Sequence, residues 1–258
     1  MKYGAQAPGA AWAMTWILLP LVGIASGIVA GILGVGGGTI LVPAMVFLGI
    51  EAHSAIGTST LAMIFTSLSG TIRNDAKGGL QVAAVIQIGI ASLLGAQGGA
   101  FLTTLLKTRT LEILFAILLI FITISGLRKT NIEKRSPTKW LVAGRALTGL
   151  TGGFLSGLFG IGGGIVMVPL QILLLGEDLI TAVKTSLGVI VITALGATIA
   201  HAMHGQVLVL EGITLGAGGV IGAQIGTRML PALPQSTVKI IFAILATILA
   251  SALIFWGK

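Results

Sequence analysis

Two glycine-rich segments are the places in this sequence where backbone atoms could bind a ligand. Residues 31–43 read Gly-Ile-Leu-Gly-Val-Gly-Gly-Gly-Thr-Ile-Leu-Val-Pro, and a close copy returns 126 residues later (157 − 31) at 157–169. Such glycine runs disfavour a continuous helix. A broken helix exposes unpaired N–H groups at the start of its second piece, where these groups and the helix dipole favour an anion. The pattern predicts an anion site, or turns beside one, at Gly36, Gly37, Gly38, Gly162, Gly163 and Gly164.

Hydroxyl and amide side chains near these segments extend the predicted site. Thr39 follows the first glycine run, whereas Ile165 holds that place after the second. Two Thr-Ser pairs come next at matching places, and hydroxyl donors suit the oxygens of an oxyanion. Two glutamines lie deep in apolar sequence, where each amide needs a polar partner. These candidates are Thr58 with Ser59, Thr185 with Ser186, Gln97 and Gln224.

Each of these features also has a purely structural interpretation. Glycines let helices pack closely in a bilayer, and a buried glutamine can link two helices. Serine and threonine hydroxyls often bond to the carbonyl one turn earlier in their own helix. The sequence leaves both roles open for the Thr-Ser pairs and the glutamines. It favours a role in the site for the two glycine runs, because packing alone does not need a break at the same place in both halves.

Three cationic or titratable residues could attract an anion or couple transport to protons. Lys184 precedes Thr185, although a lysine at a helix end also extends to the membrane interface. Arg73 ends an apolar segment, where it is either solvated or part of an anion funnel. His201 shares a helix face with His204, and histidine titrates near neutral pH. No carboxylate or thiolate ligand set accompanies them, so neither a metal ion nor another cofactor is expected.

Membrane-spanning helices must position these residues. The chain has 258 residues, of which 55% are hydrophobic and 9% charged, and its mean hydropathy is +1.07. A soluble domain carries about 25% charged residues. Strand-like alternation is absent, so the expected fold is an all-α integral membrane protein. The sequence contains no cysteine, which excludes disulfides and thiol chemistry.

Eight apolar segments are long enough to cross a bilayer, which takes about 20 residues. Two shorter segments, 39–50 and 165–175, follow the glycine runs, and each either crosses the membrane or re-enters it. The first long segment continues into a glycine run, so it is interpreted as a span and not as a signal peptide. The predicted long spans are 12–33, 54–72, 80–106, 110–127, 139–159, 179–200, 207–230 and 238–256.

The two halves of the chain repeat each other. After one inserted residue the offset is 127, which places Thr58-Ser59 on Thr185-Ser186 and Gly95-Ala96-Gln97 on Gly222-Ala223-Gln224. We expect one transporter domain made of two membrane repeats, residues 1–132 and 133–258. If the short segments cross, each half has five crossings and the halves are inverted. If they re-enter, each half has four crossings and the halves are parallel. The inverted scheme is favoured, by analogy with other transporters.

The distribution of charge and the absence of catalytic and nucleotide-binding motifs exclude several classes of function. The net charge of +8 gathers mainly at 128–145. A basic segment of this kind marks a cytoplasmic loop and is not a nucleic-acid signal. No nucleophile with a base and no Walker-type loop occurs, so an enzyme is not expected. Without an ATP site, transport must be passive or driven by a gradient.

The doubled glycine motif, followed each time by an apolar stretch with proline, a Thr-Ser pair and Gly-Ala-Gln, resembles the sulfite exporter TauE/SafE family. The resemblance covers about 21–256. It implies a multi-pass protein of a prokaryotic plasma membrane that carries sulfite or organosulfur anions. We expect a secondary transporter of small sulfur-containing oxyanions, with sulfite export as the favoured reaction. A non-transporting scaffold or assembly protein, and a carrier of another small organic anion, stay open as alternatives.

Overall fold

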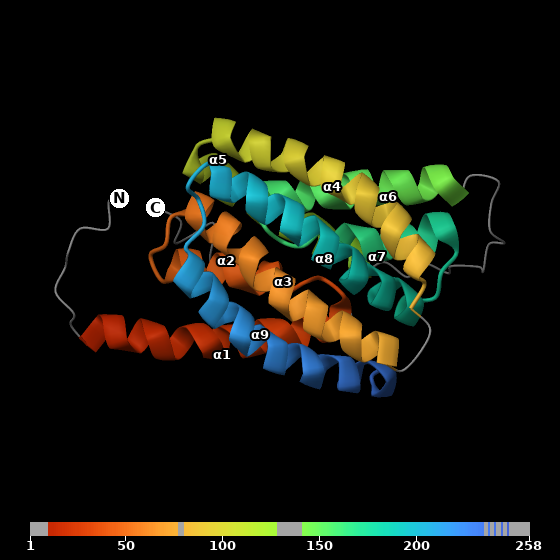
Figure 1. Cartoon of the computed structure of the whole chain (residues 1–258), viewed down its shortest axis with the longest axis horizontal. Coiled ribbons are helices and arrows are strands. Elements are labelled where there is room, and N and C mark those ends of the chain that lie inside the picture. The colour runs from red at the N-terminus through yellow and green to blue at the C-terminus, as the bar shows by residue number, and fades with distance from the viewer. Residues whose placement is uncertain are drawn as a thin grey trace.

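The computed structural model describes residues 10–76, 80–127 and 141–234, together with positions 237, 240, 244 and 247. Within these ranges the chain is helical and contains no strand (Figure 1), which confirms the all-α prediction. The helices are α1 (Ala10–Leu33), α2 (Gly38–Phe47), α3 (Ala52–Ala76), α4 (Val82–Leu105), α5 (Thr108–Leu127), α6 (Leu141–Phe159), α7 (Gly164–Leu175), α8 (Leu179–Met203) and α9 (Val209–Met229), with a 3-10 turn η1 (Leu230–Ala232).

Five of the described helices, α1, α3, α4, α8 and α9, are long and apolar enough to cross a membrane. Two further predicted spans form helices α5 and α6, of 20 and 19 residues, which are not among those five. Glycines and Arg145 lower the hydropathy of α6. The eighth predicted span, 238–256, lies outside the described residues except for single positions. The chain is therefore a multi-pass helical membrane protein.

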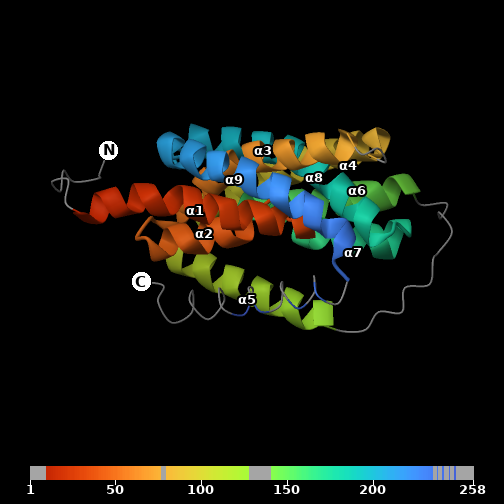
Figure 2. The same ribbon diagram turned by 90° about the horizontal axis from the view of Figure 1, so that it is seen from below.

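Three helices that run in one direction, α1, α3 and α9, form the first bundle. A Cβ atom added to Gly23 of α1 would overlap the backbone of Leu215 in α9, and one added to Gly27 would overlap Gly219. The residue numbers of the contacting positions increase together along both helices, so α1 and α9 are parallel. Figure 2 shows them side by side. Helix α3 packs on α9 in the same direction, since Thr66 contacts Gly219 and Gln224 bonds Ser69.

The second bundle consists of α4, α6 and α8, which are also parallel. A Cβ atom at Gly95 of α4 would meet the carbonyl of Leu150 in α6, and one at Gly99 would meet Phe154. Helix α8 packs on the other side of α4, where its residue Gly196 accepts a hydrogen bond from Gln97. Small residues at intervals of four let these helices approach to backbone contact. Glycines outside the two glycine runs therefore serve close helix packing at these two interfaces, as the structural interpretation of glycine predicts.

The two bundles meet along α3 and α8, which are antiparallel. The hydroxyls of Thr60 and Thr198 lie 3.0 Å apart, and Gly70 packs on Leu187. All helices of the first bundle thus run opposite to those of the second. Each bundle takes two helices from one half of the sequence and one from the other. Residues 1–132 and 133–258 are consequently interleaved in space.

Each glycine run reverses the chain, so α1 with α2 and α6 with α7 form two hairpins. The Ser26 hydroxyl in α1 donates to the Gly37 carbonyl at 2.8 Å, which shows that the chain has already turned back along α1. Only residues 48–51 link α2 to α3, and α3 begins at the end of the molecule where α1 begins (Figure 1). The short segments are therefore returning segments that run back along α1 and α6. Helix α1 is parallel to α3 and antiparallel to α6, which are the directions that the inverted scheme predicts. That the short segments cross the membrane stays a prediction.

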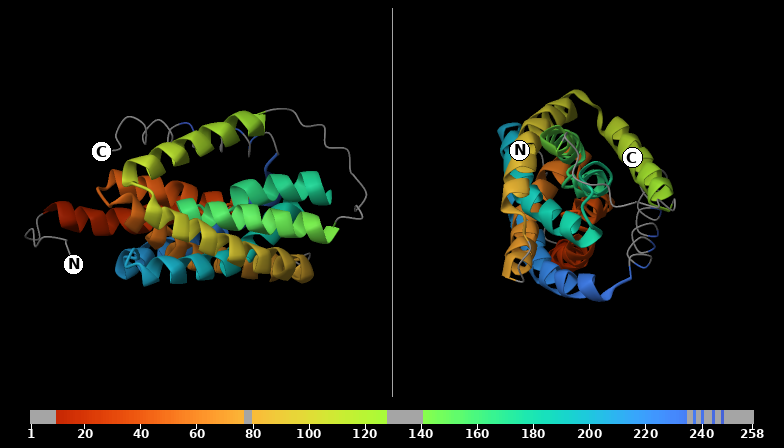
Figure 3. Two further views of the ribbon diagram at one scale, coloured as in Figure 1. Left: turned by 90° about the horizontal axis from the view of Figure 1, so that it is seen from above. Right: turned by 90° about the vertical axis from the view of Figure 1, so that its right-hand side faces the viewer.

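Helix α5 lies on the outside of the two bundles, as the left view of Figure 3 shows. It begins at Thr108, directly after a short turn that ends α4. Its first residues still contact the body of the protein, since Leu111 is fully buried. The predicted site residues thus lie in the six bundle helices, in the two returning segments and in the glycine turns that precede those segments.

Candidate functional site

The two glycine turns, residues 34–38 and 160–164, lie against each other at the centre of the molecule. A Cβ atom added to Gly38 would overlap the Gly160 carbonyl, and one added to Gly164 would overlap the Gly34 carbonyl. At the middle, a Cβ atom on Gly162 would lie 3.4 Å from the Gly36 Cα. The turns therefore run antiparallel in backbone contact. The structure brings together all six glycines that the sequence predicted for the site.

The backbone conformation of the turns is available mainly to glycine. The φ angles are 75° at Gly36 and 88° at Gly37 in the first turn, and 80° at Gly162 and 68° at Gly163 in the second. L-residues with a side chain rarely adopt this left-handed region. Gly37 and Gly163 are also the residues that precede the first turns of α2 and α7. The glycine runs thus end one helix and start the next within five residues.

Two serine hydroxyls hold the turns from the opposite half of the sequence. The Ser59 hydroxyl in α3 lies 2.8 Å from the Gly160 carbonyl and 2.7 Å from the Ile56 carbonyl of its own helix, and its one proton serves both. Ser186 in α8 donates to the Gly34 carbonyl at 2.8 Å. Both side chains are fully buried. Each hydroxyl proton is thereby used by the protein, so these serines position the turns. The bond to the carbonyl one turn earlier, which the sequence left open, describes the contact of Ser59 with Ile56. The sequence did not identify the Gly160 and Gly34 carbonyls as partners.

The three predicted threonines differ in what they bond. The Thr58 hydroxyl accepts a hydrogen bond from the Leu208 N–H at 2.9 Å, so it fastens the α8–α9 link to α3. The hydroxyls of Thr39 and Thr185 are buried and have no partner among the described residues. A buried polar group without a partner is uncommon and needs an explanation, such as a ligand. Thr39 stands at the first turn of α2, directly after Gly38.

Apolar side chains cover the centre of the turns in this conformation. A Cβ atom on Gly36 would lie 3.0 Å from Ile190 and 3.1 Å from the Met63 sulfur. Both side chains are fully buried. The polar groups without partners therefore lie beside the contact of the two turns and not within it.

Comparison with known proteins assigns the chain to a family. The family model described as "Sulfite exporter TauE/SafE" matches residues 19–253. The chain belongs to the TauE/SafE family. It is 27% identical over 270 residues to the probable membrane transporter protein YunE of Bacillus subtilis, covering 95% of this chain and 99% of that protein. It is 34% identical over 195 residues to a probable membrane transporter protein of Methanocaldococcus jannaschii, covering 72% and 73%. The family and these relatives are membrane transporters and not enzymes.

The two predicted glutamines of this TauE/SafE protein connect helices within the bundles. Gln97 donates to the Gly196 carbonyl at 3.0 Å. Gln224 donates to the Ser69 hydroxyl at 2.9 Å, and its amide oxygen accepts from Arg73 at 3.1 Å. These bonds join α4 to α8 and α9 to α3, and they lie away from the glycine turns. The packing interpretation that the sequence left open describes both glutamines in this conformation.

The predicted cationic residues lie near the C-terminal end of α3 and near the N-terminal end of α8. Arg73 is half-buried and bonded to Gln224, while its Nε atom has no partner within the described residues. Lys184 is half-buried and follows Val183, whose carbonyl would lie 2.9 Å from a Cβ atom on Gly34. Both cations thus stand at the end of the TauE/SafE fold where α8 begins, next to the tip of the α1–α2 hairpin.

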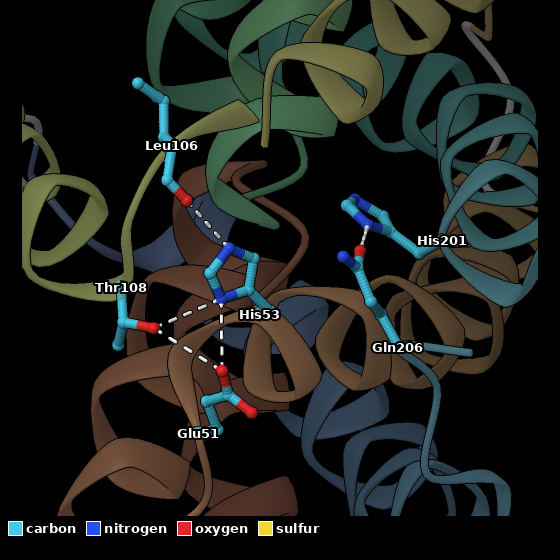
Figure 4. A network of polar contacts seen from close by, with 6 residues as sticks. All are labelled: Glu51, His53, Leu106, Thr108, His201 and Gln206. Atoms are coloured by element: carbon cyan, nitrogen blue, oxygen red, sulfur yellow. Dashed lines mark hydrogen bonds and ion pairs between the residues drawn. The ribbon is translucent and has the colours of Figure 1, made fainter. Parts of the chain in front are cut away.

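His201 lies at the opposite end, where α8 ends, and is fully buried. Its Nε2 atom lies 2.8 Å from the Gly157 carbonyl of α6, and its Nδ1 atom lies 2.8 Å from the Gln206 amide oxygen (Figure 4). The same view shows His53 between the Leu106 carbonyl and Thr108. The sequence points to His201 as a titratable residue but not to Gly157 or Gln206 as its partners, because both contacts depend on the fold.

Two acidic residues lie between α7 and α8. Burial raises the pKa of Glu177, an effect that the nearby Arg145 partly opposes. At Asp178 burial acts in the same direction, but hydrogen bonds from Thr181 and Ile180 outweigh it and lower the pKa. Asp178 thus acts as the N-cap of α8. Within the described ranges, no group of three or more acidic or histidine side chains is placed to hold a metal ion.

Proposed function

We propose that this TauE/SafE protein is a secondary transporter of small sulfur-containing oxyanions, with sulfite export as the favoured reaction. The observation that carries the proposal is the contact between two glycine turns that begin α2 and α7, with the unpaired buried hydroxyl of Thr39 beside them. Helix N-termini and hydroxyl donors suit an oxyanion. The family description supports sulfite as the substrate.

The anion would bind beside the turns, at the N-terminal ends of α2 and α7. In this proposal the backbone N–H groups of 36–38 and 162–164 and the hydroxyls of Thr39 and Thr185 replace its hydration. Ser59, Ser186 and Thr58 hold this arrangement in place, since their bonds in the structure go to protein atoms. Arg73 and Lys184 would attract the anion to the end of the fold where α8 begins.

We also propose that residues 1–132 and 133–258 are inverted repeats that form one transport unit. The antiparallel directions of α1 and α6 and the reciprocal serine bonds to Gly160 and Gly34 support this. Alternating access would then move the two bundles against each other along α3 and α8. The basic linker 128–145 would face the cytoplasm of a prokaryotic cell. Because the sequence carries no ATP site, the movement would be passive or driven by a gradient.

One observation favours the scaffold alternative. Met63 and Ile190 fill the space at the middle of the turns, as a static packing core would. A scaffold, however, does not need two helix breaks that meet at one point. It also does not need buried hydroxyls without partners, which cost free energy of about 1–3 kcal/mol each. Transport is therefore the better-supported function.

Thermal stabilisation of the purified protein by anions tests the proposed site. The panel is sulfite, thiosulfate, sulfate, a sulfonate, acetate and chloride at matched ionic strength. A ligand present at about 100 times its Kd stabilises the folded state by about 2.7 kcal/mol, or roughly 5–10 °C in Tm. We expect this shift with a sulfur oxyanion and its loss in Thr39→Val.

The matched control is Thr214→Val, because in the described part of the chain the Thr214 hydroxyl bonds to the Leu210 carbonyl of its own helix. This variant should keep the anion response of the unmodified protein. A flat panel in protein shown to be helical by circular dichroism would contradict the proposal and favour the scaffold. A response to acetate alone would instead indicate a carrier of another small organic anion.

A further inference from the structure

The two ring nitrogens of His201 have partners that fix how it can be protonated. A carbonyl oxygen can only accept, so the Nε2 atom, 2.8 Å from the Gly157 carbonyl, must carry hydrogen. The Nδ1 atom faces the terminal amide of Gln206 at 2.8 Å. An amide presents an acceptor oxygen and, after a half-turn, a donor nitrogen. His201 is therefore hydrogen-bonded in both protonation states: neutral Nδ1 accepts from the Gln206 NH2 group, and protonated Nδ1 donates to the Gln206 oxygen.

The contacts of His201 connect the two bundles near a glycine turn. Gly157 lies in α6, less than one helical turn before Gly160, whose carbonyl accepts from Ser59. A Cβ atom on Gly57 of α3 would lie 3.0 Å from the His201 Cβ. The His201 side chain is thus in contact with α3 of the first bundle and α6 of the second. A change in its charge acts on the interface along which the bundles would move.

We propose that His201 is a proton-binding site that couples anion transport to protons. This inference rests on the proposed function and names its coupling ion. Protonation places a positive charge in a buried position close to residues 160–164, where the anion would bind. The charge favours anion binding, and by linkage a bound anion favours protonation of His201 by the same factor. Proton and anion would therefore bind together.

The other half of the sequence lacks this proton site. At the offset of 127, the residue that corresponds to His201 is Asn74 in α3. Asn74 is also buried, but an amide does not titrate, and its Nδ2 atom has no partner among the described residues. A single titratable group in two otherwise similar positions gives one proton per transport unit. It also supplies the natural substitution for a test, His201→Asn.

A test must distinguish protonation of His201 from protonation of the other ionisable groups at this end of the molecule. All three histidines of the chain lie here, since His53 is in the first turn of α3 and His204 directly follows α8. His53 is held by Leu106, Thr108 and Glu51, whose carboxylate lies 3.4 Å from it. No acidic or basic residue occurs in the part of α6 around Gly157. The further charged groups near the ends of the packed elements are Lys107, Arg109, Glu112 and Glu211.

The test measures thiosulfate binding as a function of pH, because thiosulfate loses no proton of its own near neutral pH. Apparent Kd values come from the thiosulfate dependence of Tm. In the unmodified protein the affinity should fall about tenfold as pH rises across the histidine range. In His201→Asn this dependence should vanish, and in Gln206→Leu, which cannot satisfy both protonation states, it should weaken. His204→Asn, a change at an exposed residue one turn away, should behave like the unmodified protein.

A second measurement needs no anion. Side-chain NMR of histidine-labelled protein follows three imidazoles, and the three single asparagine variants assign them. His201 should change protonation reversibly across the histidine range. An imidazole that stays in one state, or a pH dependence of binding retained in His201→Asn, would overturn the inference. If no anion stabilises any variant, the proposed function fails, and the NMR titration alone then decides whether the proton site exists.

Discussion

At the scale of single residues, two glycines with the same backbone conformation differ in the space around them. Gly37 and Gly49 both have φ of 88°. A Cβ atom on Gly37 would overlap the Ser26 hydroxyl, whereas one on Gly49 would meet nothing within 4 Å. The left-handed conformation costs an L-residue about 1–2 kcal/mol at either position. Of the two positions, only a side chain at Gly37 would also clash with a neighbour, and this clash would disturb the candidate site.

We therefore expect Gly37→Ala to be more harmful than Gly49→Ala. Overpacking adds about 1–3 kcal/mol to the cost at Gly37, and it displaces the hydroxyl that donates to the Gly37 carbonyl. Gly49→Ala should lower Tm only modestly and keep the anion response. The measurement is Tm with and without the stabilising anion for both variants. Equal losses at the two positions would show that the tight fit of the turn is unimportant.

At the scale of elements, the sequence predicted the local features of the helices and turns. It did not predict which helices pack against each other. The glycine breaks, the short helices and the Thr-Ser pairs follow from composition and spacing, which act within a few residues. The interleaving of α1 with α9 and of α6 with α4 depends on contacts between distant segments. The same limit applies to Thr58 and Thr185, which match in sequence. Only Thr58 meets the N–H of Leu208, and no local pattern gives that difference.

The reciprocal serine bonds lead to a prediction about symmetry. Ser59→Ala would leave the Gly160 carbonyl without this donor, and Ser186→Ala would do the same to the Gly34 carbonyl. An unsatisfied buried acceptor costs about 1–3 kcal/mol. The two bonds have the same length and burial, and the further contact of Ser59 with Ile56 stays within its own helix, so we expect similar losses of stability from the two variants. Thermal unfolding measures them, and a cost confined to one serine would argue against equivalent hairpins.

At the scale of the whole molecule, the interleaving of the sequence halves defines which parts can move. Within the bundles, α1 packs on α9 and α4 packs on α6 through glycines at backbone distance, which resists sliding. Between the bundles, α3 and α8 meet through side chains such as Thr60 and Thr198, and the two glycine turns are in backbone contact. The sequence repeat places the boundary between two repeats at residues 132 and 133. The packing groups the helices into two bundles that each draw on both halves, and in the proposed transport these bundles would be the moving units.

Cross-linking can distinguish these two boundaries, because the sequence contains no cysteine. The pair Thr60→Cys with Thr198→Cys joins the bundles, where the native hydroxyls lie 3.0 Å apart. If the bundles move against each other, oxidation should reduce thiosulfate uptake into proteoliposomes at least about tenfold, and a reductant should restore it.

The control pair, Leu61→Cys with Gly212→Cys, joins α3 to α9 inside the first bundle. A Cβ atom on Gly212 would lie 3.3 Å from the Leu61 Cβ, near the separation of about 3.8 Å found in disulfides. This bond links the two halves of the sequence but not the two bundles, so uptake should persist after oxidation. Loss of uptake with the control pair alone would place the moving boundary between the sequence halves. Uptake that survives complete oxidation of both pairs would exclude movement along α3 and α8, and with it the alternating access proposed for this fold.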